Sequence, residues 1–63
     1  MKLKQIEVGS VMQRRRGPGR IKVLEIVDGI ARVEEEGYRQ KRLWPVSWLE
    51  SDFALSQDQS WDE

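Results

Sequence analysis

Residues 21–35, with the sequence IKVLEIVDGIARVEE, decide the fold of this 63-residue chain. Two runs rich in β-branched and other apolar residues flank Asp28-Gly29, the strongest short hairpin signal, because a tight two-residue turn needs residues that accept a positive φ. The pattern predicts an antiparallel hairpin with one arm over residues 21–27 and the other over residues 30–35.

The register of this hairpin assigns its side chains to two faces. With a two-residue turn, Glu25 lies opposite Arg32, and the remaining residues of the two arms pair one for one on either side of this pair. The face predicted to form the core carries Leu24, Ile26, Ala31 and Val33. The other face carries the Glu25–Arg32 pair with Val23, Val27 and Ile30, so we expect it to be only partly covered.

A second turn and a third strand follow the hairpin. Glu36-Gly37 signals the turn, and residues 38–44 alternate until Pro45, which ends the strand because it has no N–H for the ladder. The acidic run over residues 34–36 then faces the basic run over residues 39–42, which predicts a cross-strand charge ladder. Successive strand residues point to opposite faces, so the three glutamates do not converge on a metal ion.

The segment over residues 47–55 is open to two interpretations. Ser47 and Glu50 fit a capping box that would start a helix at Ser47. The apolar spacing fits a helix to about Leu55, and it fits a helical turn followed by a short strand over residues 52–55 equally well.

A basic loop precedes the hairpin. A short strand is predicted over residues 10–13, and the Gly17-Pro18-Gly19 run cannot continue it, because proline lacks an N–H and glycine is permissive. Residues 14–20 therefore form a loop that carries four arginines. Guanidinium groups and glycine amides on such a loop suit phosphate contacts.

The order of these elements, over roughly residues 7–55, resembles the small SH3-like barrels, including Tudor-like and KOW-type modules. We expect a mostly β fold: a small SH3-like barrel or a strongly bent antiparallel meander with a short C-terminal helix or helical turn. Residues 1–55 would form a single SH3-like β-domain and residues 56–63 an acidic flexible tail. The start over residues 9–11, the Arg-Gly loop and the Glu36-Gly37-Tyr38 turn are also similar to small uncharacterised proteins of phages and prophages.

Composition narrows the class of function. The chain has no cysteine and no histidine, which excludes thiol nucleophiles, imidazole bases and zinc sites of the usual ligand types. We expect no enzymatic activity, no catalytic residue, no cofactor and no metal. The lack of cysteine and of an apolar stretch of about 18 residues predicts a cytoplasmic protein without membrane contact.

Charge distribution favours partner binding. Residues 1–24 carry seven cations and one carboxylate, whereas residues 25–63 carry four cations and ten carboxylates. The SH3-like resemblance implies a module that binds nucleic acid or peptide. The leading expectation is a nucleic-acid-associated or regulatory module, with the arginine loop and the third strand as its contact surface. The predicted contact residues are Arg14, Arg15, Arg16, Arg20, Lys22, Tyr38, Arg39, Lys41, Arg42 and Trp44.

Two alternatives use other surfaces. The partly covered hairpin face, with Val23, Val27 and Ile30, would suit a protein partner or a homodimer interface. The acidic C-terminal half, with Trp61 as an anchor, would suit an inhibitor or adaptor that docks on a basic partner.

Overall fold

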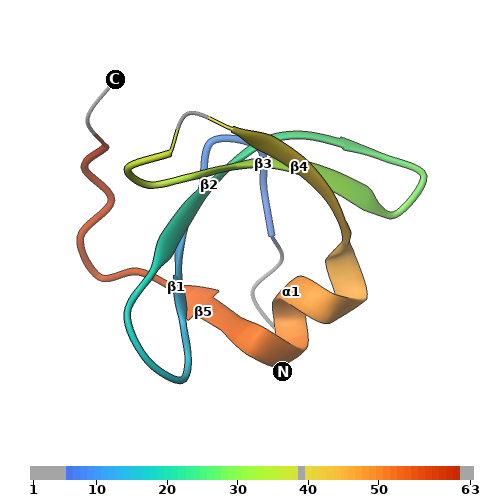
Figure 1. Cartoon of the computed structure of the whole chain (residues 1–63). Coiled ribbons are helices and arrows are strands. Elements are labelled where there is room, and N and C mark those ends of the chain that lie inside the picture. Colours follow the sequence, from blue (N-terminus) through green and yellow to red (C-terminus); the bar gives the residue numbers. More distant parts are fainter. Residues whose placement is uncertain (1–5, 39, 62–63) are drawn as a thin grey trace.

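The computed structural model describes residues 6–38 and 40–61 as one bent antiparallel sheet with one short helix (Figure 1). The strands follow the order β4-β3-β2-β1-β5, and every neighbouring pair is antiparallel. The elements are β1 (Val11–Arg14), β2 (Arg20–Val27), β3 (Ile30–Glu35), β4 (Lys41–Pro45), α1 (Val46–Asp52) and β5 (Phe53–Leu55).

The mostly β fold that the sequence predicts is confirmed. Of the two forms expected, the structure is the bent meander, because β4 and β5 are the two edges of the sheet and do not pair with one another. The helix α1 connects these edge strands and lies across the concave side of the sheet (Figure 1). No helix in the described part of the chain is long and apolar enough to cross a membrane.

The hairpin register is confirmed near its turn and wrong further out. Asp28 and Gly29 have φ values of 53° and 76°, as the predicted tight turn requires. The expected pairing holds as far as Glu25 opposite Arg32, but a bulge between Val23 and Glu25 then places Val23, not Leu24, opposite Val33.

This bulge changes which side chain enters the core. The extra residue interrupts the alternation of faces, so that Val23 and Ile26, three residues apart, both face the core. Val23 is completely buried, whereas Leu24 is only half-buried, and the prediction that Leu24 belongs to the core face is therefore wrong. The same change removes Val23 from the partly covered face, where Val27 and Ile30 remain exposed.

The helix begins one residue earlier than predicted. Pro45 is its N-cap residue and no side chain caps it, so the capping box between Ser47 and Glu50 is wrong. The reason lies in the sheet: the Val46 N–H donates to the Gly29 carbonyl oxygen at 2.8 Å, which starts the first turn directly at the end of β4. The interpretation with a strand after the helix is confirmed by β5.

The core lies between the concave face of the sheet and α1. Its buried members come from four strands and the helix: Met12, Ile21, Val23, Ala31, Val33, Leu49 and Phe53. Trp44 packs against this cluster, with its ring centroid 4.7 Å from that of Trp48 and 6.0 Å from that of Phe53. Large aromatic rings contribute much of the apolar area that so small a domain can bury.

Residues 56–61, in the predicted tail, contact the first residue of β1 and the first residue of β2. The Gln59 side chain accepts a hydrogen bond from the Val11 N–H and donates one to the Val11 carbonyl oxygen, both at 2.8 Å. A side-chain amide thus pairs with the backbone as a neighbouring strand would. The flexibility expected for residues 56–63 stays a prediction.

A candidate binding groove on the concave face

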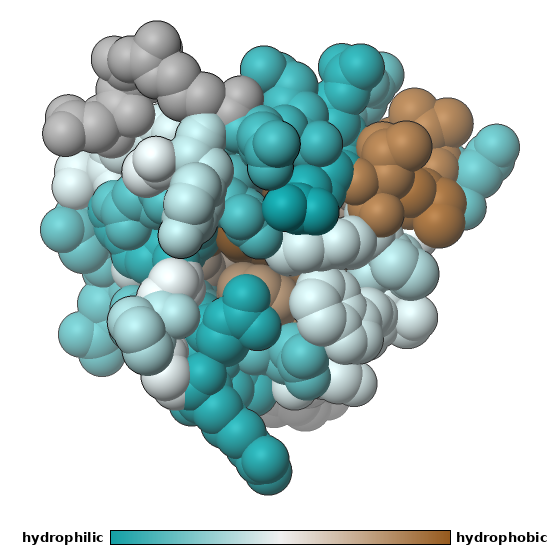
Figure 2. Space-filling model, in the orientation of Figure 1, coloured by the Kyte–Doolittle hydropathy of each residue, from teal (hydrophilic) through white to brown (hydrophobic). Residues whose placement is uncertain are grey.

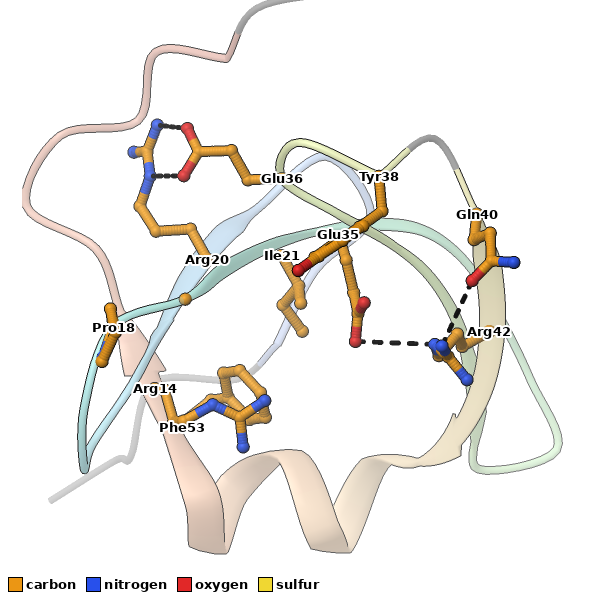
Figure 3. A pocket seen from close by; sticks show the side chains of 11 residues that line it. Arg14, Pro18, Arg20, Ile21, Glu35, Glu36, Tyr38, Gln40, Arg42 and Phe53 are labelled. Carbon is orange, nitrogen blue, oxygen red and sulfur yellow. Dashed lines mark hydrogen bonds and ion pairs between the residues drawn. The ribbon is translucent and has the colours of Figure 1, made fainter.

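An open groove of 590 Å³ lies on the concave side of the sheet, between the arginine loop and β4 (Figure 3). We call it the concave groove. Its lining residues are Arg14, Pro18, Gly19, Arg20, Ile21, Glu35, Glu36, Tyr38, Gln40, Arg42 and Phe53. In Figure 2, which has the orientation of Figure 1, apolar colour is visible in the hollow near the middle of the molecule, between hydrophilic walls.

Aromatic and apolar groups form the floor and one rim of the groove. Ile21 and Phe53 are buried and belong to the core, so the floor is rigid. Arg14 lies over the Phe53 ring, with its Cζ atom 5.1 Å from the ring centroid, a distance at which cation and ring attract. Tyr38 is 65% exposed and extends from the β3–β4 turn over the groove (Figure 3).

The wall opposite the arginine loop holds a second guanidinium. Val33 pairs with Arg42, so Arg42 shares the concave face with the buried Val33. Glu35 lies two residues further along β3 and therefore on the same face, and its Oε2 atom is 3.5 Å from Arg42 Nε. Arg42 also donates a hydrogen bond to Gln40 Oε1 at 3.2 Å (Figure 3).

Arg20 lies at the edge of the groove and joins three segments of the chain. Its Nε and Nη2 atoms donate to the two carboxylate oxygens of Glu36 at 3.2 and 2.8 Å (Figure 3). Its Nη1 and Nη2 atoms donate to the carbonyl oxygens of Asp58 at 2.8 Å and Ser60 at 3.1 Å. Its Cζ atom also lies 5.8 Å from the centroid of the Trp61 ring.

The charges of this cluster stabilise one another. The hydrogen bond from Arg20 lowers the pKa of Glu36, and the same contact raises the pKa of Arg20. Hydrogen bonds from the side chain and backbone of Ser60 lower the pKa of Asp58. Because four contacts already occupy the Arg20 donors, few remain for an external ligand.

The loop predicted over residues 14–20 is shorter in the structure, because Arg14 ends β1 and Arg20 begins β2. The two arginines that remain in the loop lie around the end of α1. The Arg15 backbone N–H donates to the Asp52 carbonyl oxygen at 2.8 Å, and its guanidinium donates to the Glu50 carbonyl oxygen at 3.1 Å. These contacts satisfy carbonyl groups that a helix C-terminus leaves unpaired. Arg16 is exposed and borders a shallow recess beside Asp52.

The structure brings together only some of the residues that the sequence predicts as contact residues. Arg14, Arg20, Tyr38 and Arg42 all line the concave groove, whereas Lys22 and Lys41 flank Glu34 in the ladder, on the convex face by strand alternation. Trp44 lies in the aromatic cluster beside the core. Arg39 lies outside the described residues.

Seven groove residues are missing from the predicted contact residues, among them Glu35, Gln40 and Phe53. Glu35 and Gln40 were detectable, since alternation places them two residues from Val33 and Arg42 respectively. Phe53 had no such signal, because its position depends on how α1 returns the chain to the sheet. Among residues 6–38 and 40–61, no group of three or more acidic side chains converges on a metal site.

No protein-family model matches this sequence, and comparisons with curated proteins and with solved structures likewise find no match. The concave groove and its residues are therefore the basis on which a function can be assigned.

Proposed function

We propose that this chain is a non-enzymatic, nucleic-acid-associated or regulatory module that binds single-stranded nucleic acid in the concave groove. The observation that carries the proposal is the position of the groove, which has the arginine loop on one side and Tyr38 and Arg42 on the other. These two segments are far apart in sequence, and the sequence predicts that they form one contact surface. They now border one open site with an aromatic rim.

The element order supports an SH3-like assignment within this proposal. Four strands in a meander, a short helix between β4 and β5, and a last strand paired with β1 follow the expected order. The sheet remains open, which departs from a closed barrel. The likeness to phage and prophage proteins and a cytoplasmic location belong to the same proposal.

Each groove residue has a role in this proposal. Tyr38 offers an exposed ring on which an unpaired base stacks, and such stacking is sequence-tolerant because every base has a π-face. Arg14 and Arg42, on opposite sides, bind phosphates of the same strand. The exposed Arg16 guanidinium extends the phosphate path beyond the groove.

Two acidic groups limit the affinity of this site. Glu35 is bound to Arg42 and lies within the wall, and Glu36 is bound to Arg20. A phosphate that approaches Arg42 competes with the Glu35 carboxylate, so we expect a weak, strongly salt-dependent interaction. Replacement of Glu35 by glutamine removes a like charge and should strengthen binding.

The test is an amide chemical-shift titration of the isotopically labelled chain with short DNA and RNA oligonucleotides at two salt concentrations. Shifts should cluster at residues 14–20 and 38–44. With two or three phosphate contacts on a single strand, affinity should fall about 7- to 20-fold between about 50 and 200 mM salt. No shift at low salt would contradict the proposal.

Two variants locate the site. Tyr38→Ala should weaken binding by about 5- to 160-fold through loss of base stacking, and it should leave folding intact because Tyr38 is exposed. Val8→Ala is the control, because Val8 is 62% exposed, uncharged and outside the groove. Equal losses for both variants would show that binding is not in the concave groove.

A further inference from the structure

The convex face of the sheet exposes three large apolar side chains side by side at the β2–β3 hairpin. Val27, Ile30 and Leu43 are 55%, 39% and 68% exposed, and they line a shallow apolar depression together with Glu25 and Arg32. We call these three residues the hairpin patch. A brown area at the upper right of Figure 2 lies over the hairpin tip.

The strand register explains why these side chains lie together. Val27 pairs with Ile30, and Ile30 pairs with Pro45, which makes one row across the strands apolar. The next row consists of Glu25, Arg32 and Leu43. Leu43 is thus a diagonal neighbour of Ile30 on the same face, within reach of it.

Single exposed apolar residues are ordinary on a protein surface, but a contiguous group on a sheet face indicates an interaction site. The apolar side chains buried in the described part of the chain number only eight. A domain this small needs the free energy that it gains by burying apolar surface. It loses that gain at Val27, Ile30 and Leu43 unless a partner covers them.

We propose that the hairpin patch is the interface of a two-fold symmetric homodimer. A two-fold axis places the hairpin patch of one copy against the same patch of the other copy. The patch must therefore be complementary to itself. Glu25 and Arg32 provide the required complementarity of charge, because they lie beside the patch with opposite signs, so that Arg32 of each copy faces Glu25 of the other.

Two further observations favour a second copy over a different partner. The Glu25–Arg32 pair within one chain is loose, with 3.6 Å between its atoms and both side chains more than half exposed, so both groups are available across an interface. The chain has a formal net charge of zero, so two copies do not repel each other as strongly charged proteins would.

The size of the patch sets the strength of the dimer. Standard interfaces bury about 800 Å² on each partner, and three partly exposed side chains offer less than half of that. The dimer is therefore weak and reversible, with self-association at about 10 µM to 1 mM chain. It leaves the concave groove open, because the patch is on the opposite face of the sheet.

The test is sedimentation velocity of the full chain from about 10 µM to about 1 mM, together with amide shifts recorded across the same dilution. The mean mass should rise with concentration, and the shifts should cluster at Val27, Ile30 and Leu43. A mass that remains monomeric throughout would overturn the proposal and leave the patch to a partner of another sequence.

Substitutions decide whether the patch itself forms the interface. Ile30→Lys should abolish the concentration dependence, while Val8→Lys, the same change at an apolar residue that is 62% exposed outside the patch, should preserve it. Dimerisation that survives Ile30→Lys would overturn the assignment.

A charge exchange provides a second test that does not depend on the apolar residues. Glu25→Arg and Arg32→Glu should each weaken the dimer at least threefold, and the double variant should restore it. Both residues are exposed, so folding should persist, and circular dichroism checks this. Failure of the double variant to restore association would overturn the proposed two-fold contact.

Discussion

Replacement of Val23 by alanine tests the bulge that sets the core. Val23 is fully buried, and the change removes two methyl groups, which contributes about 1.6 kcal/mol at about 0.8 kcal/mol per group. The cavity left behind adds about 1 kcal/mol, so the free energy of unfolding should fall by about 2 to 3 kcal/mol. In a domain of this length, that corresponds to a loss of about 10 to 20 °C in Tm.

Leu24→Ala is the matched comparison, because Leu24 is the neighbouring residue in the same strand and is only half-buried. It removes more atoms than Val23→Ala but should cost only about 1 kcal/mol, because those atoms are already partly in water. A hairpin without the bulge predicts the reverse order, with Leu24 in the core and Val23 on the exposed face.

Urea denaturation followed by tryptophan fluorescence measures both variants, and equal m values would show that the unfolding transitions are comparable. Valine has the higher β-propensity on a scale that spans about 1 kcal/mol, so part of the difference between the two variants reflects propensity and the rest reports burial. A larger loss for Leu24→Ala than for Val23→Ala would refute the bulged register and the core that follows from it.

Two further predictions concern residues 56–61. The pKa values of Glu36 and Asp58 lie below their ordinary 4.5 and 3.8, so the stabilisation from these carboxylates is full above those values and is lost as pH falls through the lower folded values. The Trp61 indole NMR resonance should therefore shift below about pH 4, and a position unchanged from about pH 6 to about pH 2 would contradict this. Gln59→Ala should speed amide hydrogen exchange near β1 about tenfold, whereas the control Gln57→Ala should not, and equal rates would show that the Gln59 contacts do not stabilise this segment.

The sequence predicted most of the hairpin and part of the site because local rules govern them. Asp28-Gly29 specifies a turn whose twist matches its strands, and the pairing next to it follows from that turn. Arg42 lies on the concave face by strand alternation, which is a local geometric rule, but β4 begins only at Lys41, so Tyr38 lies in the β3–β4 turn and not in the strand predicted over residues 38–44. The arginine loop was predicted because Gly-Pro-Gly interrupts a strand wherever it occurs.

The helix start and the environment of the arginines were not predictable in this way. Ser47 and Glu50 match a capping pattern, yet a hydrogen bond from Val46 to the distant Gly29 starts the helix before it. Arg14 and Arg20 are alike in sequence, but one lies over a ring in the groove and the other joins the β3–β4 turn to residues 56–61. Contacts with segments remote in sequence decide these outcomes.

The sequence by itself determined the β class, the hairpin with its turn and the basic loop, because each depends on backbone preferences and side-chain alternation over a few neighbouring residues. Only the tertiary structure decided the bulge beside Leu24, the open edges of the sheet and the groove between Arg14 and Arg42. The physical reason is that a sheet bends where packing against α1 requires it, and that bend sets which distant side chains face each other.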